Sequence, residues 1–252
     1  MTQIAQPLFD ALKRCYSIVL LIALWEAVVR FGFAPPALLP APSAVVVALV
    51  RDLGDRHFLG DVILTLYRLF TGLAIAIGAG VLIGISAAQS RLGPLVLEPI
   101  VRVLSPLPKI VFFPAFLLLL GFGSASRIVL VVIDAIFPVL LAAYYGARAI
   151  DEKLIWSARA AGMSQAMCLF RVTLPAALPS ILTGLRIAIV IGCIVVFLSE
   201  MVVPGDGLGD VLIRAARSFQ TVQMFVPLVT ISLLGFALDY AIVRIRNTLV
   251  NW

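Results

Sequence analysis

Charged residues are scarce in this sequence: Asp, Glu, Lys and Arg together form 13% of its 252 residues. Soluble domains typically carry about 25% charged and roughly 45–50% apolar residues, whereas 62% of this chain is hydrophobic and its mean hydropathy is +1.13. The composition therefore excludes an ordinary water-soluble core. A helix needs ~20 apolar residues to cross a bilayer, so the length allows five or six spans and no large second domain.

Histidine and cysteine are also rare, which argues against metal and disulfide chemistry. His57 has no cluster of ligand residues around it, and the three cysteines, Cys15, Cys168 and Cys193, show neither pairing nor metal-ligand spacing. Scattered acidic residues disfavour a membrane enzyme, which would need nucleophiles, metal ligands or paired carboxylates in one pocket. A Gly-x4-Gly-Lys-Ser/Thr phosphate-binding motif is absent, so we expect no ATPase site and no cofactor in this chain.

The long apolar runs predict an all-α integral membrane protein with about six transmembrane helices. The runs lie at 16–33, 62–88, 97–120, 126–147, 180–203 and 224–246. No small-residue cleavage site follows the first run, which predicts a retained anchor rather than a signal peptide. We expect residues 1–61 to form an N-terminal cytoplasmic tail, the first span and an external excursion, and residues 62–252 to form the transmembrane core.

Basic residues outnumber acidic ones, 19 to 13, and cluster beside the apolar runs. This pattern follows the positive-inside rule, so no nucleic acid partner is expected. With both termini and residues 148–179 in the cytoplasm, the inner ends hold Lys13, Arg14, Arg91, Arg148, Lys153, Arg159, Arg171, Arg244 and Arg246. The outer side then holds Arg30, Arg51, Arg56, Arg127, Arg214 and Arg217. The bias favours a multi-pass topology with both termini cytoplasmic.

Small residues mark the second span as an interior helix. It carries Gly72, Gly78, Gly80 and Gly84. Small residues let membrane helices approach closely, so this helix is expected to pack inside the bundle.

The third span is interrupted by prolines and charges. It includes Pro94, Pro99, Pro106, Pro108 and Pro114, and also Glu98, Arg102 and Lys109. Proline removes a backbone donor, and freed carbonyls at membrane depth are tolerated only where protein or a watery cavity satisfies them. This segment is therefore expected to face a pathway instead of lipid.

Seven charges lie within or at the edges of the predicted spans: Arg68, Arg102, Lys109, Asp134, Arg186, Glu200 and Asp239. A charge at the bilayer centre costs roughly 2.5–3.5 kcal/mol on insertion scales, so most must face the bundle interior. One hypothesis is that Lys109, Arg186 or Arg102 attracts an anionic solute. The candidate path residues are Pro106, Pro108, Lys109, Pro114, Asp134, Arg186 and Glu200, with Arg68 and Asp239 as helix-packing charges. The alternative is that all seven form interhelical ion pairs or reach the interface.

The most informative motif lies in the longest polar stretch. Residues 156–162 read Trp-Ser-Ala-Arg-Ala-Ala-Gly, and nine residues later 172–175 read Val-Thr-Leu-Pro. The pattern predicts two short helices joined by a turn, with Gly162 as a left-handed cap and Ser164 capping the second helix. Leu154, Ala158 and Ala161 are expected to share one face. Such a helix could dock in a partner's groove or lie on the membrane surface as an ordinary loop.

The spacing resembles the cytoplasmic "EAA" motif of binding-protein-dependent ABC importer permeases. Ala158, Gly162, Val172, Leu174 and Pro175 match the motif in register, whereas Trp156 stands at the usual Glu and Ser157 at the usual Ala. The resemblance extends to the nitrate, sulfonate and taurine branch of that family. It is carried by segments 39–43, 106–110, 121–123, 137–138, 174–179, 184–186 and 207–209 and by Arg68, Gly72, Pro114, Glu200 and Asp239.

The resemblance implies a MetI-like, type I importer fold with a cytoplasmic coupling helix at about 151–171, in a bacterial inner membrane. The residues implied in coupling to the ATPase are Trp156, Ser157, Ala158, Arg159, Ala161, Gly162, Val172, Leu174 and Pro175. The implied partners are separate ATPase subunits that bind ATP and Mg, an extracytoplasmic solute-binding protein, a second permease copy and membrane lipid. A self-contained channel or secondary carrier is the alternative, but it leaves the spacing of the motif unexplained.

Overall fold

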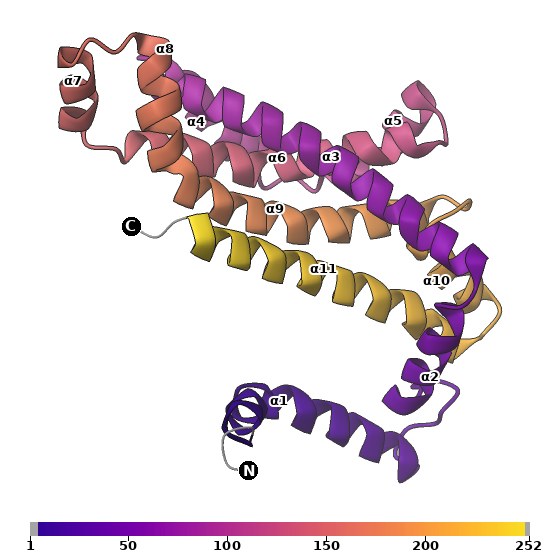
Figure 1. The fold of residues 1–252 in the computed structure, drawn as a ribbon. Helices are drawn as coiled ribbons and strands as arrows, with labels where there is room; N and C mark the ends of the chain where they lie inside the picture. The colour runs from indigo at the N-terminus through magenta and orange to yellow at the C-terminus, as the bar shows by residue number, and fades with distance from the viewer. Residues whose placement is uncertain (1–4, 250–252) are drawn as a thin grey trace. The chain divides into compact units, whose positions relative to one another are not determined.

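The computed structural model describes the backbone of residues 5–249 and the side chains of residues 16–249, and all regular structure in that range is helical (Figure 1). The helices are α1 Ala5–Arg30, α2 Pro42–Asp52, α3 Arg56–Gln89, α4 Gly93–Leu104, α5 Phe113–Leu120, α6 Ser124–Arg148, α7 Glu152–Ala160, α8 Gln165–Cys168, α9 Leu174–Val202, α10 Leu208–Arg217 and α11 Thr221–Leu249. A 3-10 helix, η1, covers Lys109–Phe112, and a π-helix, η2, covers Leu169–Thr173. The all-α prediction is confirmed.

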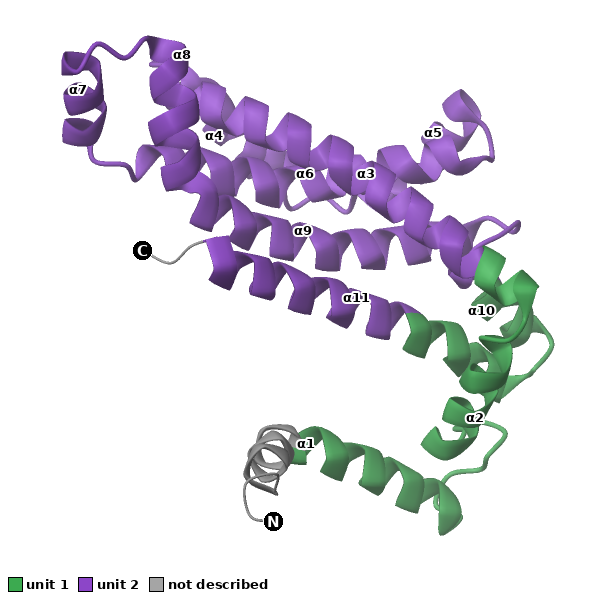
Figure 2. Cartoon of the chain, in the orientation of Figure 1, with its two compact units in different colours: residues 1–60, 211–230 green, residues 61–210, 231–252 purple. Residues whose placement is uncertain are grey.

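The chain forms two compact units (Figure 2). The first comprises residues 1–60 and 211–230, and the second comprises residues 61–210 and 231–252. In the first unit the Glu26 carboxylate accepts hydrogen bonds from the Ser43 hydroxyl at 2.7 Å and the Arg30 guanidinium at 2.6 Å. The rings of Trp25 and Phe225 also pack together there, with centroids 5.6 Å apart.

Four helical segments of the described chain are long and apolar enough to cross a membrane: Arg56–Gln89, Ser124–Arg148, Gln165–Val202 and Thr221–Leu249. The pair Gly93–Leu104 and Lys109–Leu120 is bent by 81° and makes a fifth if it counts as one span. This agrees broadly with the six predicted spans. The first predicted span, 16–33, lies in α1, where the structure describes side chains only from residue 16 onward. The predicted span 180–203 begins earlier, because the helix is continuous from Gln165.

The bend between α4 and η1 has a clear chemical origin. Pro106 and Pro108 lie between the two helices and lack the N–H groups that would continue the hydrogen-bond ladder. Pro94 and Pro114 instead occupy the first turns of α4 and α5, where a missing N–H costs little. Four of the five prolines predicted for this segment therefore begin its two helices or separate them, whereas Pro99 lies inside α4.

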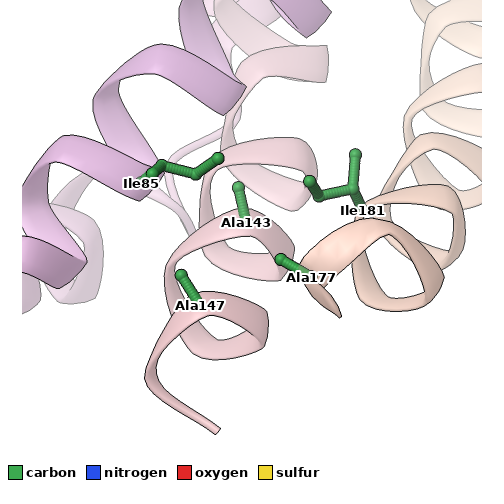
Figure 3. Close-up of a cluster of buried hydrophobic side chains, with 5 residues drawn as sticks. All are labelled: Ile85, Ala143, Ala147, Ala177 and Ile181. Carbon is green, nitrogen blue, oxygen red and sulfur yellow. The ribbon is translucent and has the colours of Figure 1, made fainter. Parts of the chain in front are cut away.

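Small residues hold the helices of the second unit together. Figure 3 shows Ile85 of α3, Ala143 and Ala147 of α6, and Ala177 and Ile181 of α9 converging in one buried cluster. Close approach between α6 and α9 depends on glycine, because a Cβ on Gly146 would lie 2.7 Å from the Ser180 Cβ. The α6–α9 pair is thus the centre of the unit.

Three of the four glycines predicted to pack closely in α3 do so, and Gly78 is the exception. A Cβ added to Gly84 would lie 2.5 Å from the Leu140 carbonyl oxygen and 2.9 Å from the Ala143 Cβ. Gly72 and Gly80 are similarly close to α6, whereas a Cβ on Gly78 would meet nothing within 4 Å. Gly78 therefore serves as an internal control.

Gly84→Ala is expected to destabilise the protein by about 1–3 kcal/mol, because the methyl group must push the α3 and α6 backbones apart. Gly78→Ala is expected to leave stability unchanged or raise it by up to about 1 kcal/mol, since alanine favours helix over glycine. Unfolding titrations in mixed detergent micelles would compare the two variants. Equal effects would contradict the close α3–α6 contact.

Candidate coupling segment and charged sites

The first candidate site is the pair of short helices α7 and α8, at the end of the second unit where α6 ends (Figure 1). The Asp151 carboxylate caps α7 by accepting a hydrogen bond from the Lys153 N–H at 2.9 Å. Gly162 follows α7 with φ of +83°, in the left-handed region, and the Met163 N–H bonds to the Ala158 carbonyl at 3.2 Å. The Ser164 hydroxyl accepts from the Met167 N–H at 3.3 Å.

Both predicted caps, Gly162 and Ser164, are confirmed. The Asp151 cap was missed, although an Asp followed by Glu152 before an apolar run is an ordinary helix-start signal. The two caps and the turn fix the geometry of α7 by local chemistry, with side-chain acceptors and a left-handed glycine at the required positions. The segment is therefore a rigid projection instead of an irregular loop.

The predicted face of α7 is wrong in part. Ala158 is buried as expected, but Leu154 is 54% exposed and Ala161 is also exposed. The reason is that α7 ends at Ala160, so Ala161 lies in the turn, and Ile155 supplies the second inward residue. Ile155 and Arg159 line a cavity of about 180 Å³ beside α8 and η2.

The outward face of α7 carries one large side chain. Helical spacing places Lys153, Trp156, Ser157 and Ala160 opposite Ile155 and Ala158, and all four are exposed. The Trp156 side chain is 62% exposed. The Trp156 ring therefore projects beyond the small side chains of Ser157 and Ala160, on a helix whose two ends are capped.

Helix α7 is joined through the Gly162 turn to α8, which continues through η2 into α9 as one helical run. Residues Val172, Leu174 and Pro175 lie at the junction of η2 and α9, and Pro175 falls in the first turn of α9. Proline at 175 cannot donate to the carbonyl of Arg171, which explains a widened π-turn at this point. Pro179 also lies inside α9 without interrupting it. The predicted coupling residues Val172, Leu174 and Pro175 therefore lie where the segment of α7 and α8 joins the long helix α9.

The second candidate site is the break in the α4–α5 pair, where Lys109 is buried. Its Nζ lies 3.1 Å from Asp134 Oδ1 and donates to the carbonyls of Ser105 at 3.1 Å and Leu107 at 3.3 Å. It also lies 4.8 Å from the centroid of the Phe137 ring. Lys109 thereby satisfies carbonyls beside the two prolines and is neutralised by Asp134. Of the predicted path residues near it, Pro106, Pro108 and Pro114 are exposed.

The third group of charges is buried around Glu200, near the end of α9. The Glu200 side chain is inaccessible and pairs with Arg68 at 2.7 Å. Its carboxylate also accepts hydrogen bonds from the Thr65 hydroxyl at 2.9 and 3.0 Å and from the Gly209 N–H at 3.2 Å. Arg68 additionally forms an ion pair with Asp206. Arg68 and Glu200 thus lie together in a buried network of ion pairs and hydrogen bonds between α3 and α9.

The burial of Arg127 was missed, since the charge count assigned it only to the outer side of the membrane. The structure buries its side chain to 1% exposure. Its guanidinium donates to the carbonyls of Phe122 at 2.9 Å, Gly123 at 3.2 Å and Val203 at 3.2 Å. The adjacent Gly-Phe-Gly turn was the available signal, because a tight turn leaves backbone carbonyls in need of donors.

Arg186 and Asp239 form the remaining interhelical pair. Arg186 of α9 donates to Asp239 of α11, with Nη2 2.8 Å from Oδ2, and the side chains are 50% and 24% exposed. Three cations expected at membrane depth, Arg68, Lys109 and Arg186, are therefore each paired with a carboxylate. The structure brings together two of the predicted path residues, Lys109 and Asp134, whereas Glu200 and Arg186 belong to two other ion pairs.

Comparisons with known proteins agree with this architecture. Residues 80–249 match the family model described as binding-protein-dependent transport system inner membrane component. A putative aliphatic sulfonates transport permease protein, SsuC, of Bacillus subtilis (strain 168) is 28% identical over 92% of this chain and 84% of its own length. The taurine transport system permease protein TauC of Escherichia coli (strain K12) is 27% identical over 94% of this chain and 88% of its own length.

The formylaminopyrimidine transport permease protein ThiX of Halalkalibacterium halodurans is 28% identical and covers 97% of both chains. Among solved structures, an inward-facing MetNI methionine ABC transporter matches with a TM-score of 0.65 and 21% identity over 77% of this chain and 96% of that chain. An amino acid ABC transporter crystallised with histidines matches with a TM-score of 0.57 and 22% identity, over 80% and 95%. These two likenesses concern the fold.

Proposed function

Because the chain belongs to the family of binding-protein-dependent transport system inner membrane components and is an ABC importer permease subunit, we propose that it transports a small organic solute with an acidic group. Sulfonate and taurine permeases among its relatives support this substrate class. The family also implies an ATPase subunit and a binding protein as partners. We extend this to a homodimeric permease in the bacterial inner membrane, with both termini cytoplasmic.

The observation that carries the coupling proposal is the geometry of α7. A nine-residue helix, capped at both ends, presents Trp156 outward. The turn at Gly162 joins it to the continuous helical run of α8, η2 and α9. We assign α7 as the helix that docks in a groove of the ATPase subunit. ATP and Mg would be bound by that partner, and a change in its groove would move the start of α9.

Affinity purification from native membranes tests this assignment. The tagged full-length chain, extracted in a mild detergent, is expected to retain an ATPase subunit, identified by mass spectrometry, and the preparation should hydrolyse ATP. The matched control is the same chain stripped of partners by washing, which should hydrolyse none. Solute uptake by the chain alone in vesicles without any ATPase would instead favour a channel or secondary carrier.

A further inference from the structure

Arg102 differs from the other cations predicted at membrane depth, because its side chain has no carboxylate partner among residues 16–249. Lys109 is neutralised by Asp134, Arg186 by Asp239, and Arg68 by Glu200. Arg102, in the last turn of α4, is exposed and forms no ion pair or hydrogen bond with any side chain of residues 16–249. It lies three residues before Ser105, at the break between the two bent helices.

An arginine in this position needs a polar neighbour. A charge at membrane depth is expensive in lipid, so it faces the bundle interior or a water-filled cavity. Broken helices at membrane depth are likewise tolerated where their backbone lines a cavity or is covered by protein. Both features coincide at the end of α4, since Arg102 and Ser105 share one face of the chain one turn apart.

A groove of about 750 Å³ lies beside this break, between α6 and α9. Its wall includes the hydroxyl-bearing residues Ser105, Tyr145, Ser180 and Thr183, and it contains no charged side chain. The volume falls within the roughly 300–1,000 Å³ typical of small-molecule sites. Another face of α9 carries the Arg186–Asp239 pair and a separate apolar groove lined by Cys193 and Phe197.

We propose that Arg102 and this hydroxyl-lined groove form the part of the solute path contributed by each permease chain, and that they receive the acidic group of the solute. The proposal deepens the proposed function and rests on it. Arg102 supplies the positive potential, and the hydroxyl groups supply hydrogen bonds to oxyanion oxygens without adding an opposing charge. Lys109 and Arg186 are thereby assigned to helix packing, because each is already paired with a carboxylate.

The experiment measures the electrostatic potential in the groove, so it needs no identified substrate. Cys15, Cys168 and Cys193 are first replaced in the full-length chain, and Thr183→Cys is added as a reporter. Inverted membrane vesicles holding the complete transporter are treated with two thiol reagents, anionic sulfonatoethyl and cationic trimethylammonioethyl methanethiosulfonate. The ratio of their reaction rates reports the sign of the local potential.

With Arg102 present, the anionic reagent is expected to react faster than it does after Arg102→Gln. The rate ratio should fall about five-fold, the order expected when a unit charge within a Debye length is removed and the reagents differ by two charges. Arg102→Lys should restore the ratio, and Arg246→Gln, at the exposed end of α11, should leave it unchanged.

Two results would overturn the proposal. If Arg102→Gln left the ratio of the two reaction rates unchanged, Arg102 would not contribute to the potential in the groove. If the Thr183→Cys thiol reacted with neither reagent, lipid or another chain would fill the groove. Copurification of the ATPase subunit is measured on the same vesicles. Its absence would defeat the proposed function, whereas its presence with an unchanged ratio would defeat only the role of Arg102.

Discussion

Glu200→Ala is expected to destabilise the protein by about 3–5 kcal/mol, because it removes the buried partner of Arg68 and leaves only the half-exposed Asp206 to balance the charge. The Arg68 side chain is 1% exposed and would lose its carboxylate at 2.7 Å. The Thr65 hydroxyl and the Gly209 N–H would lose their acceptor as well. Unfolding by a denaturing detergent, followed by circular dichroism, would measure the change.

Asp206→Asn is the matched control for this prediction. Asp206 pairs with the same arginine, but its side chain is 53% exposed, so water can replace the lost interaction. Exposed pairs contribute about 0–1 kcal/mol, and the control should fall in that range. If Glu200→Ala were as mild as Asp206→Asn, the buried network would not hold α3 and α9 together.

Trp156→Ala is expected to weaken ATPase binding by about 2–4 kcal/mol, which is roughly thirty-fold or more in Kd. Tryptophan is enriched among the residues that dominate interfaces, and the 62% exposed ring stands alone on a helix with fixed ends. Binding of the ATPase subunit to the detergent-solubilised chain, measured by titration with fluorescently labelled ATPase, would give the affinity.

Two further variants make the Trp156 result specific. Leu154→Ala removes an apolar side chain of similar exposure, 54%, from another side of the same helix and is expected to have little effect on ATPase binding. Trp156→Phe should retain part of the affinity, because it preserves an aromatic ring. Equal losses for Leu154→Ala and Trp156→Ala would contradict the assigned docking face.

The sequence predicted best those features that depend on neighbouring residues. Gly162 and Ser164 were identified correctly because a left-handed cap and a helix N-cap are determined within one turn of chain. The close α3–α6 contact was also predictable, since small residues in a membrane helix have few other uses. The exact helix end was less predictable, and the one-residue difference at Ala160 moved Ala161 off the inward face of α7.

The pairing of charges could not be predicted from the sequence. Arg68 and Glu200 lie 132 residues apart, and Arg186 and Asp239 lie 53 apart, so only the packing of helices decides which charges meet. Lys109 was a reasonable path candidate by position, but Asp134 and two freed carbonyls surround it in the folded chain. The burial of Arg127 was also missed, although the Gly121-Phe122-Gly123 turn that supplies two of its carbonyl partners was a usable sequence signal.

The proposed contact between α7 and a separate ATPase subunit can be tested by photo-crosslinking in native membranes. A benzophenone amino acid at Ser157, on the outward face beside Trp156, is expected to yield one adduct that contains the ATPase subunit. The same probe at Leu118 of α5, which is 86% exposed, should yield no such adduct. Adducts from Ser157 with lipid alone would contradict a contact with the ATPase subunit and would indicate that α7 lies on the membrane surface.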